Sequence, residues 1–143
     1  VSSFGTIYVD RENRRDIPRA GEKILETIGR GEGVAVFPEG TSSNGETVLP
    51  FKSSFFEFAA AGGLDVHYAA ITYRTPKGWP PASEAVAWWR EEDTFGGHLI
   101  KMLTLPGFDA VVTFGEKPVR ANDRKELAGK LRDEVARIFI PLK

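Results

Sequence analysis

Residues 16–38 read DIPRAGEKILETIGRGEGVAVFP and place a helix pattern directly before a strand pattern. Asp16 stands two positions before Pro18, as an N-cap residue stands before a proline in a first helical turn. Apolar residues then recur at helical spacing, which predicts a helix over residues 18–30. Residues 33–38 form a short, continuously apolar run, which is typical of a strand covered on both faces in a parallel sheet.

The same two patterns alternate along the rest of the chain. Strands are predicted over residues 4–10, 33–38, 66–73, 84–89 and 109–115, and helices over 18–30, 51–61 and 95–105. This alternation predicts an α/β fold with a mostly parallel sheet flanked by helices. Right-handed crossovers in such a sheet bring the loops that follow the strands to one edge.

A final helix is predicted after Asp123. Asp123 and Glu126 have the spacing of a capping box. Apolar residues then line one face of this helix: Leu127, Leu131, Val135, Ile138 and Phe139.

Composition narrows the class of protein. The chain has 143 residues, of which 41% are hydrophobic and 27% charged, as expected for one soluble globular domain. Nineteen Lys and Arg against 20 Asp and Glu leave a net charge of -1, so no overall positive charge favours nucleic acid. No segment is long and apolar enough for a membrane-spanning helix, and the first residues lack the features of a signal peptide.

The residue types and motifs that are missing from the sequence argue against several kinds of functional site. The chain has no cysteine, and so no disulfide, thiolate metal site or thiol nucleophile. His67 and His98 are isolated, and two such histidines do not predict a metal site. Walker, G-x-S-x-G and H-E-x-x-H motifs are absent.

Two loops that follow predicted strands contain the candidate functional residues. Arg11 comes directly after the strand over residues 4–10, and Glu39, Gly40 and Thr41 come directly after residues 33–38. Lys52 stands where the next predicted helix begins, and a helix start favours anions. Because ligands of open α/β sheets bind beyond the carboxyl ends of strands, these residues predict a phosphate or carboxylate pocket.

Each of these residues also has an ordinary structural interpretation. Arg11 lies in a run of charged residues that is typical of a solvated turn. Glu39 followed by Gly and Thr fits turn chemistry, and an exposed lysine such as Lys52 is common on any surface.

The two loops resemble the glycerolphosphate acyltransferase superfamily, whose members acylate glycerol 3-phosphate or lysophosphatidate. Four sequence blocks define that family. Residues 5–11 (GTIYVDR) resemble the second block, and residues 37–41 (FPEGT) are identical to the core of the third. Phe51-Lys52 follows at the usual place, and residues 69–71 fall where the fourth block is expected. The resemblance covers about the first half of the chain.

The resemblance implies a role for each residue. Arg11 would contact the acceptor phosphate, for which a planar guanidinium is suited. Glu39 would bind the glycerol hydroxyl, Gly40 would let the backbone approach, and Thr41 would support the loop. Lys52 would be a second phosphate contact. The implied co-substrate is acyl-CoA or acyl carrier protein, with no cofactor or metal.

The chain departs from the family pattern at three places. Ser42 stands where the family often has Arg, and Ala70 stands where its fourth block usually has Pro. The first block, His-x4-Asp, is absent, because neither His67 nor His98 is followed by an aspartate at that distance. In the family this His is the general base. We therefore expect a single acyltransferase-like domain that lacks its N-terminal part and is inactive by itself.

The resemblance implies a function for the complete protein in phospholipid synthesis. It would transfer a fatty acyl group to a glycerophosphate-type hydroxyl, in the cytoplasm and at the inner face of the membrane. Trp79, Trp88, Trp89 and the apolar face of residues 95–105 are candidates for membrane contact, but we expect most of them to pack into the core. Two other functions stay open. They are a non-catalytic phospholipid-binding or scaffolding module and an unrelated phosphate-binding α/β protein.

Overall fold

The computed structural model of the protein describes Ile7, residues 16–87 and residues 94–142. Along the chain the elements are α1 (Asp16–Gly29), the 3-10 helix η1 (Ser53–Phe56), α2 (Glu57–Ala61), β1 (Ala69–Arg74), α3 (Ala82–Ala85), α4 (Phe95–Leu103), β2 (Asp109–Phe114) and α5 (Arg124–Ile138). Apart from Ile7, the strand predicted over residues 4–10 lies outside the described residues, and so does Arg11.

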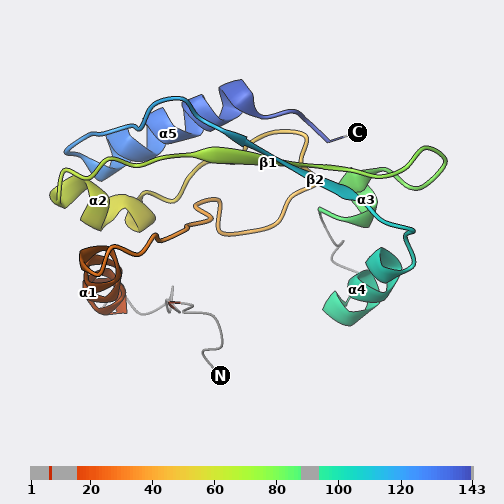
Figure 1. Cartoon of the computed structure of the whole chain (residues 1–143), viewed down its shortest axis with the longest axis horizontal. Coiled ribbons are helices and arrows are strands. Elements are labelled where there is room, and N and C mark those ends of the chain that lie inside the picture. Colours follow the sequence, from red (N-terminus) through yellow and green to blue (C-terminus); the bar gives the residue numbers. More distant parts are fainter. Residues whose placement is uncertain (1–6, 8–15, 88–93, 143) are drawn as a thin grey trace.

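β1 and β2 form a long central ribbon, with α5 along one side of it (Figure 1). The two strands are antiparallel, and their register pairs Ala69 with Phe114 and Arg74 with Asp109. An isolated antiparallel bridge between Val66 and Val119 extends the pairing beyond the strands. Both strands were predicted, at nearly these bounds.

The mostly parallel sheet was the wrong expectation for these two strands. A parallel connection needs a crossover helix that packs back onto the sheet. The segment between β1 and β2 does contain a helix, α4, as predicted. However, α4 lies beyond one end of the ribbon and packs against α3 (Figure 1), so the chain returns along β1 in the opposite direction.

Two predicted strands are not strands in the structure. Residues 33–37 have no regular secondary structure and residue 38 begins a turn, and Val36 and Phe37 are 39% and 75% exposed. An apolar run becomes a buried strand only where neighbouring strands satisfy its backbone groups. The prediction of an edge strand over residues 84–89 is wrong for the described residues 84–87. Residues 84 and 85 belong to the short helix α3 (Ala82–Ala85), which has Pro81 at its N-cap position.

The apolar face of α5 forms the centre of the described core. Leu127 and Leu131 are 0% and 2% exposed and pack against Phe56 and Ala60 of η1 and α2. Val135, one turn further along, packs with Ala70 of β1 and with Val48. The predicted cap is present, since the Asp123 carboxylate accepts hydrogen bonds from the Lys125 and Glu126 amides.

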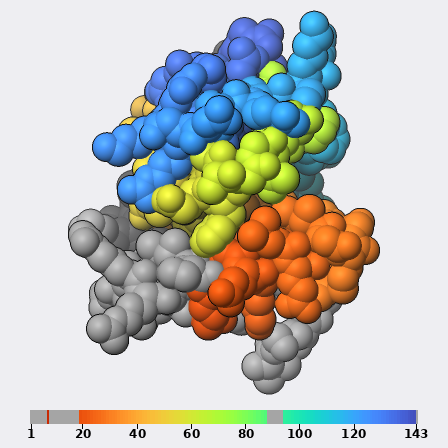
Figure 2. All heavy atoms as spheres, turned by 90° about the vertical axis from the view of Figure 1, so that its left-hand side faces the viewer, coloured from red at the N-terminus to blue at the C-terminus, as the bar shows by residue number. Residues whose placement is uncertain are grey.

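The α1 helix packs on the other side of α2. Gly21 makes this close approach possible, because a Cβ atom there would lie 1.7 Å from the Phe58 ring. Figure 2 shows the order of the layers, with α1 in orange, the segment around α2 in yellow-green, and the blue C-terminal part above. The predicted helix at residues 51–61 is therefore present as η1 and α2, with its phenylalanines facing inward.

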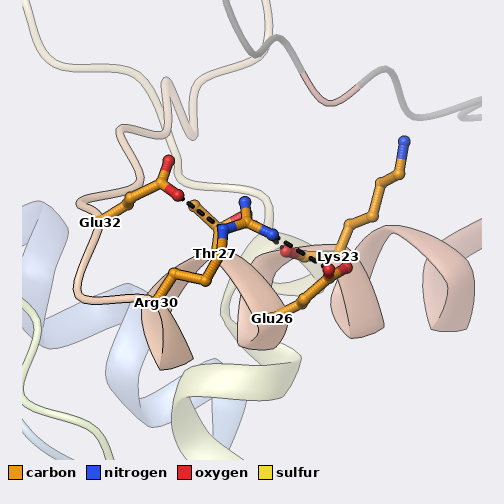
Figure 3. Close-up of polar contacts among 5 residues, drawn as sticks. All are labelled: Lys23, Glu26, Thr27, Arg30 and Glu32. Carbon is orange, nitrogen blue, oxygen red and sulfur yellow. Dashed lines mark hydrogen bonds and ion pairs between the residues drawn. The ribbon is translucent and has the colours of Figure 1, made fainter.

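Exposed ion pairs fix the end of α1 (Figure 3). The Arg30 guanidinium donates to Glu26 at 3.0 Å and to Glu32 at 2.6 Å, while Lys23 points away from this group. Thr27 donates back to the Lys23 carbonyl oxygen at 2.7 Å. Such solvent-exposed ion pairs contribute little to the free energy of unfolding, so their effect is confined to the turn after α1.

A polar cluster ties the segment before β1 to α5. The Tyr68 hydroxyl donates to Glu134 at 2.8 Å, and Arg137 donates to the same carboxylate oxygen at 2.5 Å. The hydrogen bonds from Arg137 and then Tyr68 lower the pKa of Glu134 below its ordinary 4.5. A carboxyl group whose pKa is lower in the folded than in the unfolded state stabilises the fold at pH values above its unfolded pKa. This contribution to stability is lost as the pH falls through the folded-state pKa.

The α4 helix exposes its apolar residues. Phe95, Ile100 and Leu103 are 65%, 65% and 72% exposed, whereas His98 is buried. Trp79, in the loop after β1, is 46% exposed. Packing of this face into the core is therefore not what the structure shows, and Trp88 and Trp89 lie outside the described residues.

Truncating Leu131 tests the assignment of the core. We expect Leu131→Ala to lower the free energy of unfolding by about 2–5 kcal/mol, because it leaves a cavity beneath α5. Leu103→Ala is the matched control and is expected to change it by less than about 0.5 kcal/mol, since an exposed side chain loses few contacts. Urea denaturation measures both, and equal losses would contradict this core.

Candidate functional site

The segment from Pro38 to Lys52 is a closed loop, which we call the motif loop. Its ends meet where the Lys52 amide donates to the Pro38 carbonyl oxygen at 2.9 Å. Inside this closure the Gly40 amide donates to Phe37 at 3.1 Å, and Gly40 has a φ of 67°, in the left-handed region that favours glycine. The motif residues 37–41 therefore form a tight turn at the base of a loop.

Glu39 is half-buried and points across the loop. Its Oε2 atom accepts a hydrogen bond from the Leu49 amide at 3.1 Å. A carboxylate has four lone-pair positions, so this bond orients the group without exhausting its capacity to accept. Glu39 thus joins two parts of the loop that are ten residues apart, and it keeps capacity to accept further hydrogen bonds.

The Lys52 side chain lies over Gly40. A Cβ atom at Gly40 would stand 3.1 Å from the Lys52 Nζ atom and 3.2 Å from its Cδ atom. A glycine at this position therefore allows the ammonium group to reach the motif turn. Lys52 is also the N-cap of η1, but η1 and α2 have only 4 and 5 residues, so their helix dipole adds little to this charge.

Hydroxyl and amide groups order the outer part of the loop. Thr41 is exposed and donates to the Ser42 carbonyl oxygen at 3.4 Å. The Ser43 hydroxyl accepts from the Gly45 amide at 3.2 Å, and the Asn44 side chain accepts from the Glu46 amide at 3.3 Å. These are the local contacts typical of turns.

The structure therefore brings four predicted site residues into one loop: Glu39, Gly40, Thr41 and Lys52. Arg11 lies outside the described residues, so its convergence on this loop stays a prediction. Ala70, predicted in the fourth block, is 3% exposed in the middle of β1 and packs in the core.

Sequence reasoning missed the partners that hold this loop. The Leu49 amide binds Glu39, Arg132 of α5 donates to the Val48 carbonyl oxygen at 3.3 Å, and the Leu142 amide donates to Gly45 at 2.9 Å. The dipeptide Asn44-Gly45 is a turn signal, but no pattern in the sequence connects it with Leu142.

Two other places in the described part of the chain were compared with this loop as candidate sites. Among residues 16–87 and 94–142, no cluster of three His, Asp or Glu side chains forms a candidate metal site. A depression at the start of α5 is lined by Glu57, Asn122 and Arg124, but Arg124 pairs with Glu57 there and Asp123 accepts from the Lys125 and Glu126 amides. In the same described ranges no helix has the length and apolar character needed to cross a membrane.

Comparison with known proteins connects the loop to a family. The family model described as Acyltransferase matches residues 1–74, which include the whole loop and Arg11. The chain belongs to this family. The acyltransferase fold expected from the resemblance is α/β, and the parallel arrangement of its sheet is not seen in the described strands. No solved structure matches the chain significantly.

Curated relatives fall into two groups. A 1-acyl-sn-glycerol-3-phosphate acyltransferase of Neisseria gonorrhoeae is 39% identical over 69 residues, 48% of this chain and 27% of the relative. A lyso-ornithine lipid O-acyltransferase of Rhodobacter capsulatus is 33% identical over 132 residues, 87% of this chain and 46% of the relative. Another of Rhizobium meliloti is 28% identical over 94% of this chain. The chain spans about half the length, or less, of the relatives it matches.

Substituting Glu39 tests the hydrogen bond that crosses the loop between Pro38 and Lys52. We expect Glu39→Leu to speed hydrogen exchange of the Leu49 amide roughly fivefold, the factor that a net hydrogen bond of about 1 kcal/mol represents. Glu39→Gln keeps an acceptor oxygen and should retain most of the protection. Glu46→Leu is the matched control in the same loop, and an equal effect there would contradict the assignment.

Proposed function

We propose that the complete protein transfers a fatty acyl group from a thioester carrier, acyl-CoA or acyl carrier protein, to the hydroxyl of a lysolipid. The observation that supports this is the motif loop itself. It holds the Glu39 carboxylate across the turn and brings the Lys52 ammonium over Gly40, within a chain that belongs to the acyltransferase family. No bound cofactor or metal is needed for this reaction.

The chemistry assigns a different task to each charge. The lysolipid hydroxyl oxygen attacks the thioester carbonyl carbon, the C–S bond breaks, and the carrier leaves as a thiol after proton transfer from the hydroxyl. Glu39 accepts a hydrogen bond from the acceptor and fixes the attacking oxygen in place. Lys52 and, by the family resemblance, Arg11 neutralise an anionic headgroup, for which a guanidinium fork is suited.

A glycerophosphate is the first candidate acceptor. It is favoured by the family resemblance of residues 5–11 and 37–41 and by the relatives named 1-acyl-sn-glycerol-3-phosphate acyltransferase. Its phosphate would be bound by Arg11 and Lys52. The reaction would then be acylation of lysophosphatidate in phospholipid synthesis.

A lyso-ornithine lipid is the second candidate, favoured by the extent of similarity. Relatives with that name align with 87% to 94% of this chain, whereas those named for glycerol phosphate align with less than half. Ser42 replaces the family's frequent arginine and so removes one candidate phosphate ligand. An amino-acid headgroup offers a carboxylate for Lys52 and an ammonium group for Glu39.

We expect the 143-residue chain by itself to be inactive. It contains no His-x4-Asp pair, and an alcohol attacks a thioester slowly without a general base. The complete gene product should therefore be assayed beside it. If both bind lysolipid and neither transfers an acyl group, the protein is instead a non-catalytic lipid-binding module.

We also propose that the protein works at the cytoplasmic face of a membrane, where its lipid acceptor lies. The exposed Phe95, Ile100 and Leu103 of α4, with Lys101 between the last two, support this. Apolar side chains on a short helix insert at the level of the lipid headgroups, and a neighbouring lysine favours anionic lipids.

Activity measurements on the complete gene product test the proposed reaction. We expect Arg11→Ala and Glu39→Ala each to lower kcat/KM for the acceptor on the order of 100-fold, as misplacement of a reacting group does. Arg14→Ala and Glu46→Ala are matched controls for charge and location and should keep near-normal rates. Acylation of radiolabelled lysophosphatidate and lyso-ornithine lipid, compared in one assay, identifies the acceptor. Near-normal rates in both site variants would refute the site.

Vesicle co-sedimentation tests the membrane surface. We expect Ile100→Ser with Leu103→Ser to weaken binding to phosphatidylglycerol vesicles roughly tenfold or more, because two large apolar side chains are no longer buried. Leu25→Ser with Ile28→Ser removes comparable exposed residues from α1 and should have little effect. An absence of binding by the unaltered protein would contradict the proposed surface.

A further inference from the structure

Two hydrogen bonds attach the motif loop to the second half of the chain. The Leu142 amide donates to the Gly45 carbonyl oxygen at 2.9 Å, and Arg132 Nη2 donates to the Val48 carbonyl oxygen at 3.3 Å. Both donors lie outside residues 1–74, the part that matches the family model. The residues that hold the loop are therefore separate from the motif that defines it.

Contact between Gly45 and Leu142 leaves no space for a larger residue. Gly45 is buried with a φ of 70°, and a Cβ atom there would stand 2.4 Å from Leu142 Cδ1 and 2.6 Å from its Cγ. Leu142 is 8% exposed. The segment before it is fixed in turn, since the Thr72 hydroxyl of β1 donates to the Ile140 carbonyl oxygen at 3.2 Å.

These hydrogen bonds affect the position of the Leu49 amide, which is the partner of Glu39. Val48 is 6% exposed and packs with Val135 of α5, so its carbonyl group is held both by packing and by Arg132. The next residue is Leu49, whose amide holds the Glu39 carboxylate at 3.1 Å. The place of that amide is therefore set by α5 and by the segment that follows it.

We propose that Leu142 and Arg132 are positioning residues for the acceptor. Through Gly45 and Val48 they fix the Leu49 amide, and through it the direction in which Glu39 meets the acceptor. This inference rests on the proposed function, because it assigns a role in acceptor binding at the same site. Neither residue touches the acceptor.

Kinetics of Leu142→Ala in the complete gene product test this role. Acceptor kcat/KM should fall on the order of 10- to 100-fold, the scale expected for a displaced binding group, while the donor KM stays unchanged. Rates are measured well below the Tm and are expressed per folded molecule. Leu127→Ala is the matched control, since it removes a core leucine that packs in the cluster with Phe56 and Ala60. If both variants lose only thermal stability, the positioning role is wrong.

A double-mutant cycle separates the contact from general damage. Gly45→Ala should impair acceptor use because its new methyl group displaces Leu142. In the double variant with Leu142→Ala the contact is already lost, so its defect should not exceed that of the worse single variant. Gly31 also has a positive φ, but a Cβ atom added there would meet no neighbouring atom within 4 Å. Gly31→Ala therefore introduces similar backbone strain without a clash and should leave acceptor kinetics unchanged. Multiplying defects would contradict the coupling.

Hydrogen exchange gives a readout that does not need activity. The Leu49 amide should exchange faster in Leu142→Ala and in Arg132→Met than in the unaltered protein. Unchanged exchange together with unchanged acceptor kinetics overturns the inference alone. If the unaltered complete protein acylates no lysolipid, the proposed function fails. Faster Leu49 exchange would then show only that these residues anchor the loop, and the acceptor role would be rejected with the function.

Discussion

Burial of one face of α5 is the interaction on which the described structure depends. Leu127 and Leu131 bring η1 and α2 against the helix, and Val135 brings β1 and Val48 against it one turn later. The helix therefore connects the strand ribbon with the segment that carries the motif. Because full burial of each leucine contributes about 1.5–3 kcal/mol, this face outweighs the exposed ion pairs elsewhere.

The loop between Pro38 and Lys52 uses this support to hold two opposite charges near one turn. Closure by the Lys52 amide sets the base of the loop, and Gly40 allows the lysine side chain to lie over it. Glu39 then receives its direction from the Leu49 amide. A carboxylate and an ammonium group positioned in one loop before a ligand binds are suited to a charged lipid headgroup.

Local sequence signals predicted most of the elements. The capping residue Asp123 and the apolar repeat after it predicted α5. The apolar spacing after Pro18 predicted α1, with both ends within two residues of those observed. Pairing was not predictable in the same way. The alternation of strands and helices suggested a parallel crossover between β1 and β2, but whether α4 covers the sheet depends on tertiary contacts that its own sequence does not specify.

The candidate site was predictable to the extent that it lies in one continuous stretch. Glu39, Gly40, Thr41 and Lys52 carry the family motif and come together through local turns. Their supports, Arg132 and Leu142, are about 90 residues away in sequence and act through backbone carbonyl groups, which leave no residue-type signature. Only the folded position of α5 connects them with the motif.

An experimental structure of the complete gene product with a bound lysolipid would show whether the three charged side chains meet at one headgroup. We expect the Arg11 guanidinium, the Glu39 carboxylate and the Lys52 ammonium all to lie within about 3 Å of polar headgroup atoms of the same lipid molecule. A headgroup bound elsewhere, or an Arg11 side chain directed to another face of the protein, would contradict it.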